Sequence, residues 1–185
     1  MQYRRRAIHA AQALTLATLL ATGAALASAP AELAQWVPQA QAAGNARLTW
    51  FGLPIYDANL WVAPGFRQSD FHEHGFAIEL KYLRALRSAD IAERSIKEMR
   101  RIEGMSDAQA QQWLSDLRSV LRDVQPGDRI TGIHRPGRGV TFLLNGQRTG
   151  DIGDLRFGRA FFSIWLARAT REPALRAALV EGTAP

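Results

Sequence analysis

An arginine and three aromatic residues in the strand-like part of the sequence have the chemistry needed to hold a small acidic molecule. Arg47, Tyr56, Trp61 and Tyr82 lie in segments rich in aromatic and β-branched residues. On one sheet face, a guanidinium and phenol hydroxyls would bind an acidic head group while aromatic rings contact an apolar remainder. The alternative is that the tyrosines are amphipathic core residues and Arg47 is a surface charge. The pattern alone leaves both interpretations open.

Other groupings of reactive residues give weaker support for chemistry. The loop "DFHEH", residues 70–74, holds two histidines and two acids, but spacing places no third metal ligand, so we interpret it as a solvated polar loop. The chain has no cysteine and no Gly-x-Ser-x-Gly sequence, so no nucleophile is indicated. The stretch "GRGVTFLLNG" leads into a strand, unlike a phosphate-binding loop. We therefore assign no catalytic residue, metal or cofactor.

These candidate residues would be positioned by strands that precede a helical pair. The predicted elements are strands over 47–63 and 75–83, helices over 88–104 and 106–121, strands over 128–134 and 139–152, and helices near 157–166 and from 173. A Ser-x-x-Gln capping box opens the second helix at Ser106, and Asn145-Gly146 indicates a β-hairpin. The order predicts an α+β fold with a large antiparallel sheet covered by a helical layer.

A segment near the C-terminus concentrates apolar bulk beside arginines. Phe157, Phe161, Ile164 and Trp165 recur at helical spacing in and just before "GRAFFSIWLARATREPALRAAL", which also holds Phe162. Such a stripe suits a core, a membrane-facing surface or the wall of a ligand pocket. Its position after a β-hairpin favours a helix that covers the sheet. We expect the rings of Phe161, Phe162 and Trp165 to shape the apolar wall of a cleft.

The N-terminus has the layout of a secretory signal. Arg4, Arg5 and Arg6 precede an uncharged, mildly apolar run that ends in small residues. The predicted division is a signal peptide over 1–27, a short leader outside the folded domain over 28–45, and one domain over 46–185. Cleavage after Ala42 and a retained membrane anchor are the alternatives. We expect a periplasmic or secreted bacterial protein without stable membrane insertion after signal removal.

The charge balance argues against nucleic acid as a partner. The net charge of +6 falls to +3 once the three arginines of the signal are removed, because no acid lies before residue 28. The remaining arginines are interspersed with acids, and no dense basic block with interleaved aromatics occurs. Nearly all of the positive charge is guanidinium, which suits recognition of carboxylate or phosphate. The oligomeric state is not indicated.

Several motifs, in their order and spacing, resemble the exported bacterial branch of the chalcone isomerase-like family. They are "GLPIYDANLWV", "AIELKYLR", the helix over 91–99, "PGDRI", "FLLNGQRTGDI" and "AFFSIWLARATREPALRAAL". Together they cover about Arg47 to Val180. The resemblance implies a large antiparallel sheet covered by helices, with a ligand cleft between the two layers.

The resemblance also bears on catalysis. In the plant enzymes of the family, an arginine, a threonine, a tyrosine and an asparagine hold the substrate. The threonine position falls at about Phe51, which has no hydroxyl, and Ser163 is the one candidate for the C-terminal pocket hydroxyl. These departures argue against flavonoid-type cyclisation. A non-catalytic branch of the family binds fatty acids through an arginine and a tyrosine.

We therefore predict that the domain binds a small apolar or fatty-acid-like ligand in this cleft without catalysis. Arg47 is the expected anchor of the acidic group, and Tyr56 and Tyr82 are the expected hydrogen-bond donors. Trp61, Phe161, Phe162 and Trp165 are the expected wall. The alternatives are an isomerase or intramolecular lyase with Tyr56 or Tyr82 as general acid, and a protein-interaction module with a vestigial cleft.

Overall fold

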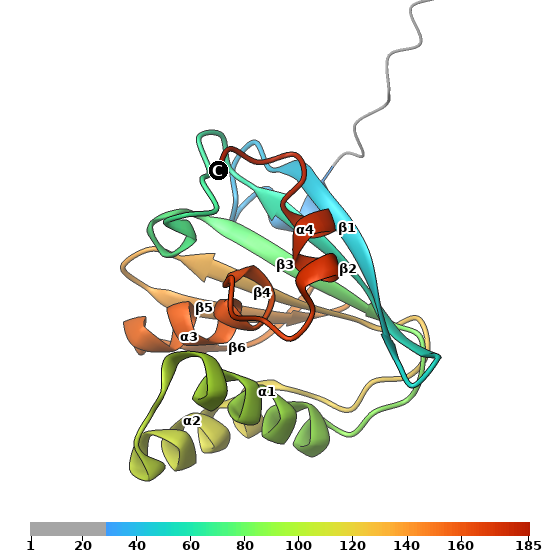
Figure 1. Cartoon of the computed structure of the whole chain (residues 1–185), viewed down its shortest axis with the longest axis vertical. Helices are drawn as coiled ribbons and strands as arrows, with labels where there is room; N and C mark the ends of the chain where they lie inside the picture. Colours follow the sequence, from blue (N-terminus) through green and yellow to red (C-terminus); the bar gives the residue numbers. More distant parts are fainter. Residues whose placement is uncertain (1–28) are drawn as a thin grey trace, which may run out of the picture.

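The domain is built on one antiparallel sheet whose strands follow each other in chain order. The computed structural model describes residues 29–185 (Figure 1). Neighbouring strands pair in the order β1-β2-β3-β4-β5-β6. Their bounds are β1 Gln41–Trp50, β2 Leu53–Val62, β3 Phe76–Tyr82, β4 Arg129–Arg135, β5 Gly139–Leu144 and β6 Gln147–Ile152. The predicted stretch 47–63 is thus a hairpin of two paired strands, longer than expected at its N-terminal end.

The helices lie on one side of the sheet, as Figure 1 shows. Their bounds are α1 Ser88–Glu103, α2 Asp107–Val120, α3 Leu155–Leu166 and α4 Pro173–Leu179, with short 3-10 turns at η1 Ala31–Leu33 and η2 Phe71–Glu73. The capping box at the start of α2 is present, since Ser106 Oγ accepts a hydrogen bond from Gln109 N at 3.2 Å. The α+β architecture with a helical layer over an antiparallel sheet is confirmed.

The main core lies between the sheet and the helices, and α3 supplies its centre. Phe157 and Phe161 pack on Phe142 of β5 and on each other, with ring centroids 5.3–6.4 Å apart. Phe162 packs against Phe161 at 5.2 Å. The helix lies close to β4 because Gly132 has no side chain there. A Cβ at that position would lie 3.3–3.4 Å from the rings of Phe161 and Phe162. The apolar C-terminal segment is therefore mainly a sheet-covering core element.

A second, smaller cluster covers the opposite face of the sheet. Leu33 and Val37, each 1% exposed, pack with Trp61, Ala77 and Ile133. This differs from the expectation that 28–45 is a leader outside the folded domain. The apolar residues of the 30–40 segment bury themselves on the sheet, and β1 already begins at Gln41. The predicted signal peptide, 1–27, lies outside the described residues.

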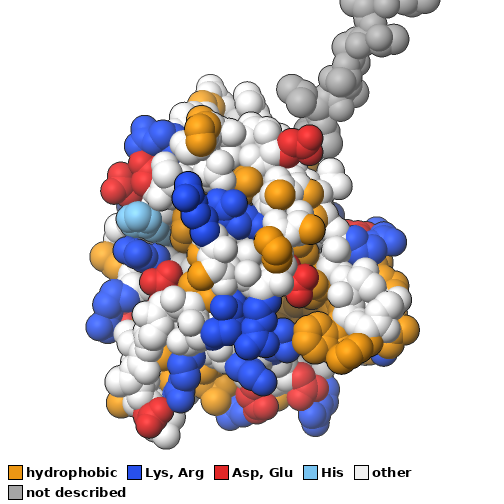
Figure 2. All heavy atoms as spheres, viewed as in Figure 1, with side chains coloured by type: hydrophobic (Ala, Val, Ile, Leu, Met, Phe, Trp, Pro, Cys, Tyr) orange, Lys and Arg blue, Asp and Glu red, His pale blue; other side chains and the backbone are white. Residues whose placement is uncertain are grey.

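Two hairpins end in the same kind of tight turn. Asn145-Gly146 joins β5 to β6 with φ angles of 49° and 83°, as its sequence predicts. Phe51-Gly52 joins β1 to β2 with closely similar φ angles of 47° and 77°. On the face in Figure 2, acidic side chains lie among the basic ones, and hydrophobic side chains gather near the end of the β1–β2 hairpin. Within residues 29–185, no helix has the length and apolar character needed to cross a membrane.

Candidate functional site

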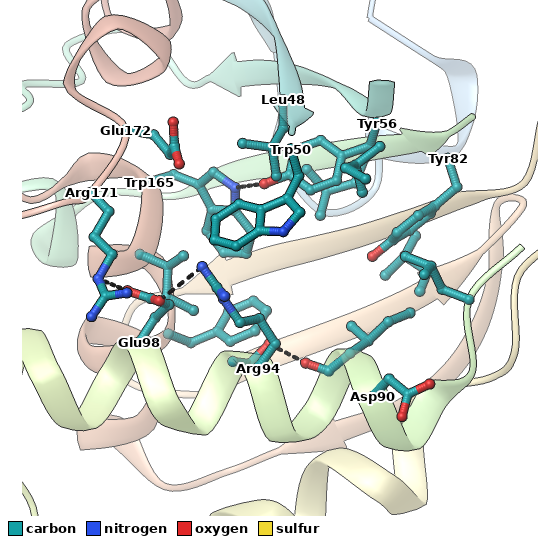
Figure 3. Close-up of a pocket in the computed structure, with 18 of the residues that line it drawn as sticks. Leu48, Trp50, Tyr56, Tyr82, Asp90, Arg94, Glu98, Trp165, Arg171 and Glu172 are labelled. Atoms are coloured by element: carbon teal, nitrogen blue, oxygen red, sulfur yellow. Dashed lines mark hydrogen bonds and ion pairs between the residues drawn. The ribbon is translucent and has the colours of Figure 1, made fainter. Parts of the chain in front are cut away.

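A cavity of about 290 Å³ lies between the helix-covered face of the sheet and helices α1 and α3. Figure 3 shows its lining side chains converging from the sheet, α1 and the loop that follows α3. Most of the wall is apolar. The residues that carry this apolar character are Leu48, Trp50, Ile55, Leu80, Leu86, Ile91, Leu121, Ile130, Phe161, Ile164 and Trp165. Such a wall suits a small molecule with a hydrocarbon part.

Tyr56 and Trp165 form one side of the cavity. Trp165 Nε1 donates a hydrogen bond to Tyr56 Oη at 3.0 Å (Figure 3). The Tyr56 ring also meets the Tyr82 ring edge-on, with centroids 5.9 Å apart. Burial raises the pKa of Tyr56 to about 12, against the smaller opposing effect of the Trp165 hydrogen bond. The phenol therefore stays protonated and its oxygen is already engaged as an acceptor.

Tyr82 places a second phenol at the cavity. Its side chain is only 2% exposed, and its hydroxyl points into the space bounded by the labelled residues in Figure 3. Burial, and next the neighbouring Tyr56, raise the pKa of Tyr82 well above its ordinary value. At neutral pH this group is a neutral donor and acceptor. It is suited to hydrogen bonding with a ligand and poorly suited to take a proton from one.

The polar end of the cavity is an acid surrounded by three arginines. Glu98 Oε1 lies 3.1 Å from Arg94 Nη2, and Glu98 Oε2 lies 3.0 Å from Arg101 Nε and 3.6 Å from Arg171 Nε. The Glu98 side chain is 8% exposed. Oε1 has no hydrogen-bond partner, since the Arg94 contact is close but poorly aligned. The buried Glu98 carboxylate thus contacts three guanidinium groups, and these groups have further N–H donors available.

Arg94 stands between this polar end and the solvent. Its side chain is 45% exposed, and its guanidinium carbon lies 4.8 Å from the centre of the Trp50 ring. Figure 3 shows Arg94 and Arg171 on either side of Glu98, below Trp50 and Trp165. Glu172 and Asp90 also line the cavity, but Asp90 is paired with Arg87 at 2.8 Å. The arrangement places positive charge at one end of an apolar space.

Four of the seven predicted site residues meet at this cavity, and Arg47 does not. Tyr56, Tyr82, Phe161 and Trp165 line it. Arg47 is on the other side of β1, because side chains alternate along a strand and its neighbour Leu48 faces the cavity. Its guanidinium binds Asp57 through two hydrogen bonds of 2.6 and 2.9 Å. The expected anchor is therefore a surface ion pair.

Trp61 and Phe162 are also placed away from the cavity. Trp61 packs with Leu33 and Val37 on the opposite face of the sheet. Phe162 is completely buried in the core, where its ring lies 4.6 Å from that of Phe76. Ser163, the candidate for a pocket hydroxyl, is also completely buried, and its Oγ donates to Ala160 O at 2.7 Å. Helical spacing identified the apolar stripe of α3 but not which of its sides faces the cavity.

The charged residues of the site were missed by sequence reasoning, although a signal was present. Arg94 and Glu98 are spaced i, i+4 on α1, and Ile91 and Ser95 lie on the same face of that helix. A charged pair beside an apolar stripe indicates a boundary between core and polar surroundings. Arg171 gave no such signal, because it belongs to the irregular stretch between α3 and α4.

The histidine loop has structural contacts of its own. His74 Nε2 lies 3.0 Å from Asp70 Oδ1. The carboxyl of Asp70 also binds Arg67, which lowers the pKa of that carboxyl. Within the described part of the chain, no group of three or more metal-ligating side chains is gathered. The contacts within this loop are those of a structured polar turn.

The chain resembles known proteins in its sequence and in its fold. Residues 43–181 match the family model described as chalcone isomerase-like. A Haemophilus influenzae protein of uncharacterized function is 31% identical over 137 residues, which are 74% of this chain and 64% of that protein's length. The crystal structure of a fatty-acid binding protein from Arabidopsis thaliana has the same fold, with a TM-score of 0.60 and 11% identity, covering 78% of this chain and 88% of the other. The chain belongs to the chalcone isomerase-like family.

Proposed function

We propose that the cavity binds a small apolar acid, such as a fatty acid, and that the exported protein does so without catalysing isomerisation. The observation that carries this proposal is the combination of an apolar wall with the guanidinium groups of Arg94 and Arg171 at one end. The fatty-acid binding protein of A. thaliana shares the fold, which supports a ligand of this class.

The charged end suits a carboxylate in particular. Glu98 already lies among the guanidinium groups of Arg94, Arg101 and Arg171, so these groups are spaced to meet a carboxylate. Guanidinium groups hold carboxylates through paired, charge-assisted hydrogen bonds. Around Glu98 itself, one carboxylate meets the guanidinium groups of Arg94, Arg101 and Arg171, so a ligand anion would offset the excess positive charge of this cluster. Arg94 takes the anchoring role first expected of Arg47.

The size of the cavity favours a short or medium-length tail. Its volume of about 290 Å³ is at the lower end of the range of roughly 300–1,000 Å³ that is usual for ligand sites. Leu80, Ile130 and Phe161 would contact the tail, and the Tyr82 hydroxyl offers a further hydrogen bond to the ligand.

The state of the phenols supports binding without catalysis. A general acid or base works best with a pKa near the working pH. Burial keeps the pKa of Tyr56 at about 12 and that of Tyr82 well above its ordinary value. Tyr56 is also held by Trp165, and Ser163 is sequestered in the core. These residues therefore suit holding a ligand better than exchanging protons with it.

Export is supported by the N-terminal pattern, and the position of the fold bears on where the signal would be cleaved. Cleavage after Ala27 would leave the whole described domain, from residue 29 onward, in the mature protein. Cleavage after Ala42 would remove Leu33 and Val37 from the opposite face of the sheet and cut into β1. The burial of Leu33 and Val37 therefore supports the earlier position.

A binding measurement with matched ligands and variants tests the proposal. Calorimetry in aqueous solution should show that dodecanoic acid binds and that dodecanol, which has the same tail without the charge, binds more weakly. Arg94→Gln should weaken acid binding about tenfold or more, as expected for loss of a charge-assisted pair. Arg47→Gln removes an arginine outside the cavity and is the control. Equal affinity for acid and alcohol, or no effect of Arg94→Gln, would contradict the proposed anchor.

A further inference from the structure

The end of the β1–β2 hairpin exposes an unusual amount of apolar surface. Trp50 is 42% exposed, Phe51 89% and Leu53 53%. Among the described residues, Leu155 is the one other large hydrophobic side chain that is exposed, and it lies at the start of α3. Figure 2 shows hydrophobic side chains gathered around the hairpin end on this face. Three of these four residues thus lie within four consecutive positions.

The backbone of this turn presents Phe51 to the solvent at an energetic cost. Phe51 has φ 47°, a left-handed conformation that Asn and Gly adopt more easily than an aromatic residue. The β5–β6 turn has the same geometry and uses Asn145 there, with φ 49°. The Phe51 ring contacts the Trp50 ring edge-on at 5.1 Å and is otherwise mostly in solvent. Packing within the described chain therefore does not account for a phenylalanine at this position.

The hairpin end is continuous with the cavity. Trp50 is partly exposed at the tip and also lines the cavity, as does Leu48 on the same face of β1. The Arg94 guanidinium lies over the Trp50 ring at 4.8 Å. A molecule that passes from the hairpin end to the cavity would therefore meet the Trp50 ring together with the Arg94 guanidinium that lies over it.

The same end of the sheet carries positive charge. Leu83 N donates to Ile55 O at 2.9 Å, which places the next residue, Arg84, beside the beginning of β2. Arg84 is exposed, and no ion pair joins it to an acid within residues 29–185. Two acids of this region are already paired, Asp57 with Arg47 and Asp90 with Arg87. Exposed basic groups beside an apolar tip are attracted to anionic lipid head groups.

We propose that the hairpin end, Trp50 to Leu53, inserts into the surface of an anionic phospholipid bilayer, and that the apolar acid passes between bilayer and cavity beside Trp50. This inference rests on the proposed function. Three side chains on a hairpin are too few for a stable protein interface, which buries about 800 Å² on each partner. They are enough for shallow insertion, in which aromatic rings lie at the level of the head groups.

The first test uses a variant that improves the turn while removing the apolar contact. Phe51→Asn reproduces the Asn-Gly turn of β5–β6, so its unfolding midpoint should equal or exceed that of the parent chain. Its binding to vesicles of phosphatidylethanolamine and phosphatidylglycerol should fall several-fold. Leu155→Asn removes an exposed hydrophobic residue elsewhere and should bind like the parent. Equal binding of all three full-length chains would overturn the proposal.

The second test reports on the hairpin itself, independently of the N-terminal segment. Because the chain has no cysteine, a polarity-sensitive dye can be attached at one introduced cysteine. The dye on Phe51→Cys should shift to the emission of an apolar environment when the vesicles are added. The dye on Ser69→Cys, in the β2–β3 loop at the other end of the sheet, should not shift. No shift at position 51, equal shifts at both positions, or a shift caused by protein concentration alone would contradict membrane insertion.

The outcomes separate this inference from the proposed function. Binding of dodecanoic acid in solution without any vesicle effect at position 51 would overturn membrane insertion and leave the cavity assignment standing. A vesicle effect without binding of the acid would contradict the proposed function and, with it, the passage of the acid from bilayer to cavity.

Discussion

Trp165 Nε1 donates a hydrogen bond of 3.0 Å to Tyr56 Oη and so joins α3 to β2 across the wall of the cavity. Both residues are largely surrounded by apolar groups, among them Phe161, whose ring lies 5.3 Å from that of Trp165. In such surroundings a donor that loses its partner is not readily satisfied by water. The bond therefore fixes the separation of the helix and the sheet at the cavity.

Replacing Tyr56 with phenylalanine should destabilise the domain. The change removes the acceptor and leaves Trp165 Nε1 without a partner, which we expect to lower the free energy of unfolding by about 1–3 kcal/mol. Urea denaturation measures this loss. Tyr82→Phe is the matched control. The Tyr82 hydroxyl points into the cavity, so its removal should lower the free energy of unfolding less. Equal losses of stability in the two variants would show that the hydrogen bond from Trp165 to Tyr56 contributes no more to stability than the Tyr82 hydroxyl does.

Stability should fall in alkaline solution because of the same phenol. The pKa of Tyr56 is about 12 in the folded protein, against an ordinary value of 10.0. As the pH rises above about 10, the unfolded chain releases this proton first, so the contribution of Tyr56 to the free energy of unfolding decreases until the pH passes about 12. Chemical denaturation across that interval, beside the ultraviolet titration of the phenols, measures the effect. Tyr56→Phe should reduce the slope, and an unchanged slope would assign it to other groups.

Glu98→Gln should tighten the binding of a carboxylate ligand. In the parent chain, the Glu98 carboxylate occupies guanidinium groups of Arg94 and Arg171 that a ligand would use. Removing its charge frees them, and we expect affinity for dodecanoic acid to rise about tenfold. Glu93→Gln is the control on the same helix, since Glu93 pairs with Arg118 at the surface. Weaker binding in Glu98→Gln would mean that Glu98 positions the arginines instead of competing with the ligand.

Gly44→Ala should loosen the packing of α4 on β1. A Cβ at position 44 would lie 2.5 Å from Leu179 O and closer still to Ala178 O, so the helix would have to shift. We expect a loss of about 1–3 kcal/mol in the free energy of unfolding. Gly153→Ala is the control, because a Cβ there meets nothing within 4 Å. Thermal unfolding compares the two, and equal stability would place α4 farther from β1 than the structure does.

Leu33→Ala tests whether the segment before β1 belongs to the fold. Leu33 is 1% exposed on the opposite face of the sheet, and removal of such a side chain lowers the free energy of unfolding by about 2–5 kcal/mol. Gln35→Ala, at an exposed position in the same segment, should change little. Chemical denaturation distinguishes them. A Leu33→Ala chain as stable as the Gln35→Ala chain would return this segment to the role of a leader.

The fold was predictable because its local signals agree with one another. The alternation in β3, the capping box at Ser106 and the Asn145-Gly146 turn each specify a local structure that the tertiary contacts then use. The segment before β1 was not predictable in this way. It has no regular period, and Leu33 and Val37 are buried by contact with a sheet that is remote from them in the sequence.

The site was predictable in part of its aromatic lining, without Trp61 and Phe162, and not in its charged part. Tyr56, Tyr82 and Trp165 are large and amphipathic, so their residue types indicated a cavity wall. The anchor was misplaced because the strand phase of Arg47 depends on pairing register, which the sequence left undetermined. Arg94 and Arg171 come together through the packing of α1 against the end of α3, a tertiary relationship without a local signal.

The meander order of the strands also bears on how the protein is made. Each strand pairs with the strand before it, so the sheet can grow in the order of synthesis, with one helical pair inserted between β3 and β4. The wall contributed by α3 and by residues 170–172 arrives only with the last part of the chain. Until then, the apolar face of the sheet lacks that cover. The cavity is thus completed late, and a ligand that fits it would stabilise only a chain that already includes α3 and residues 170–172.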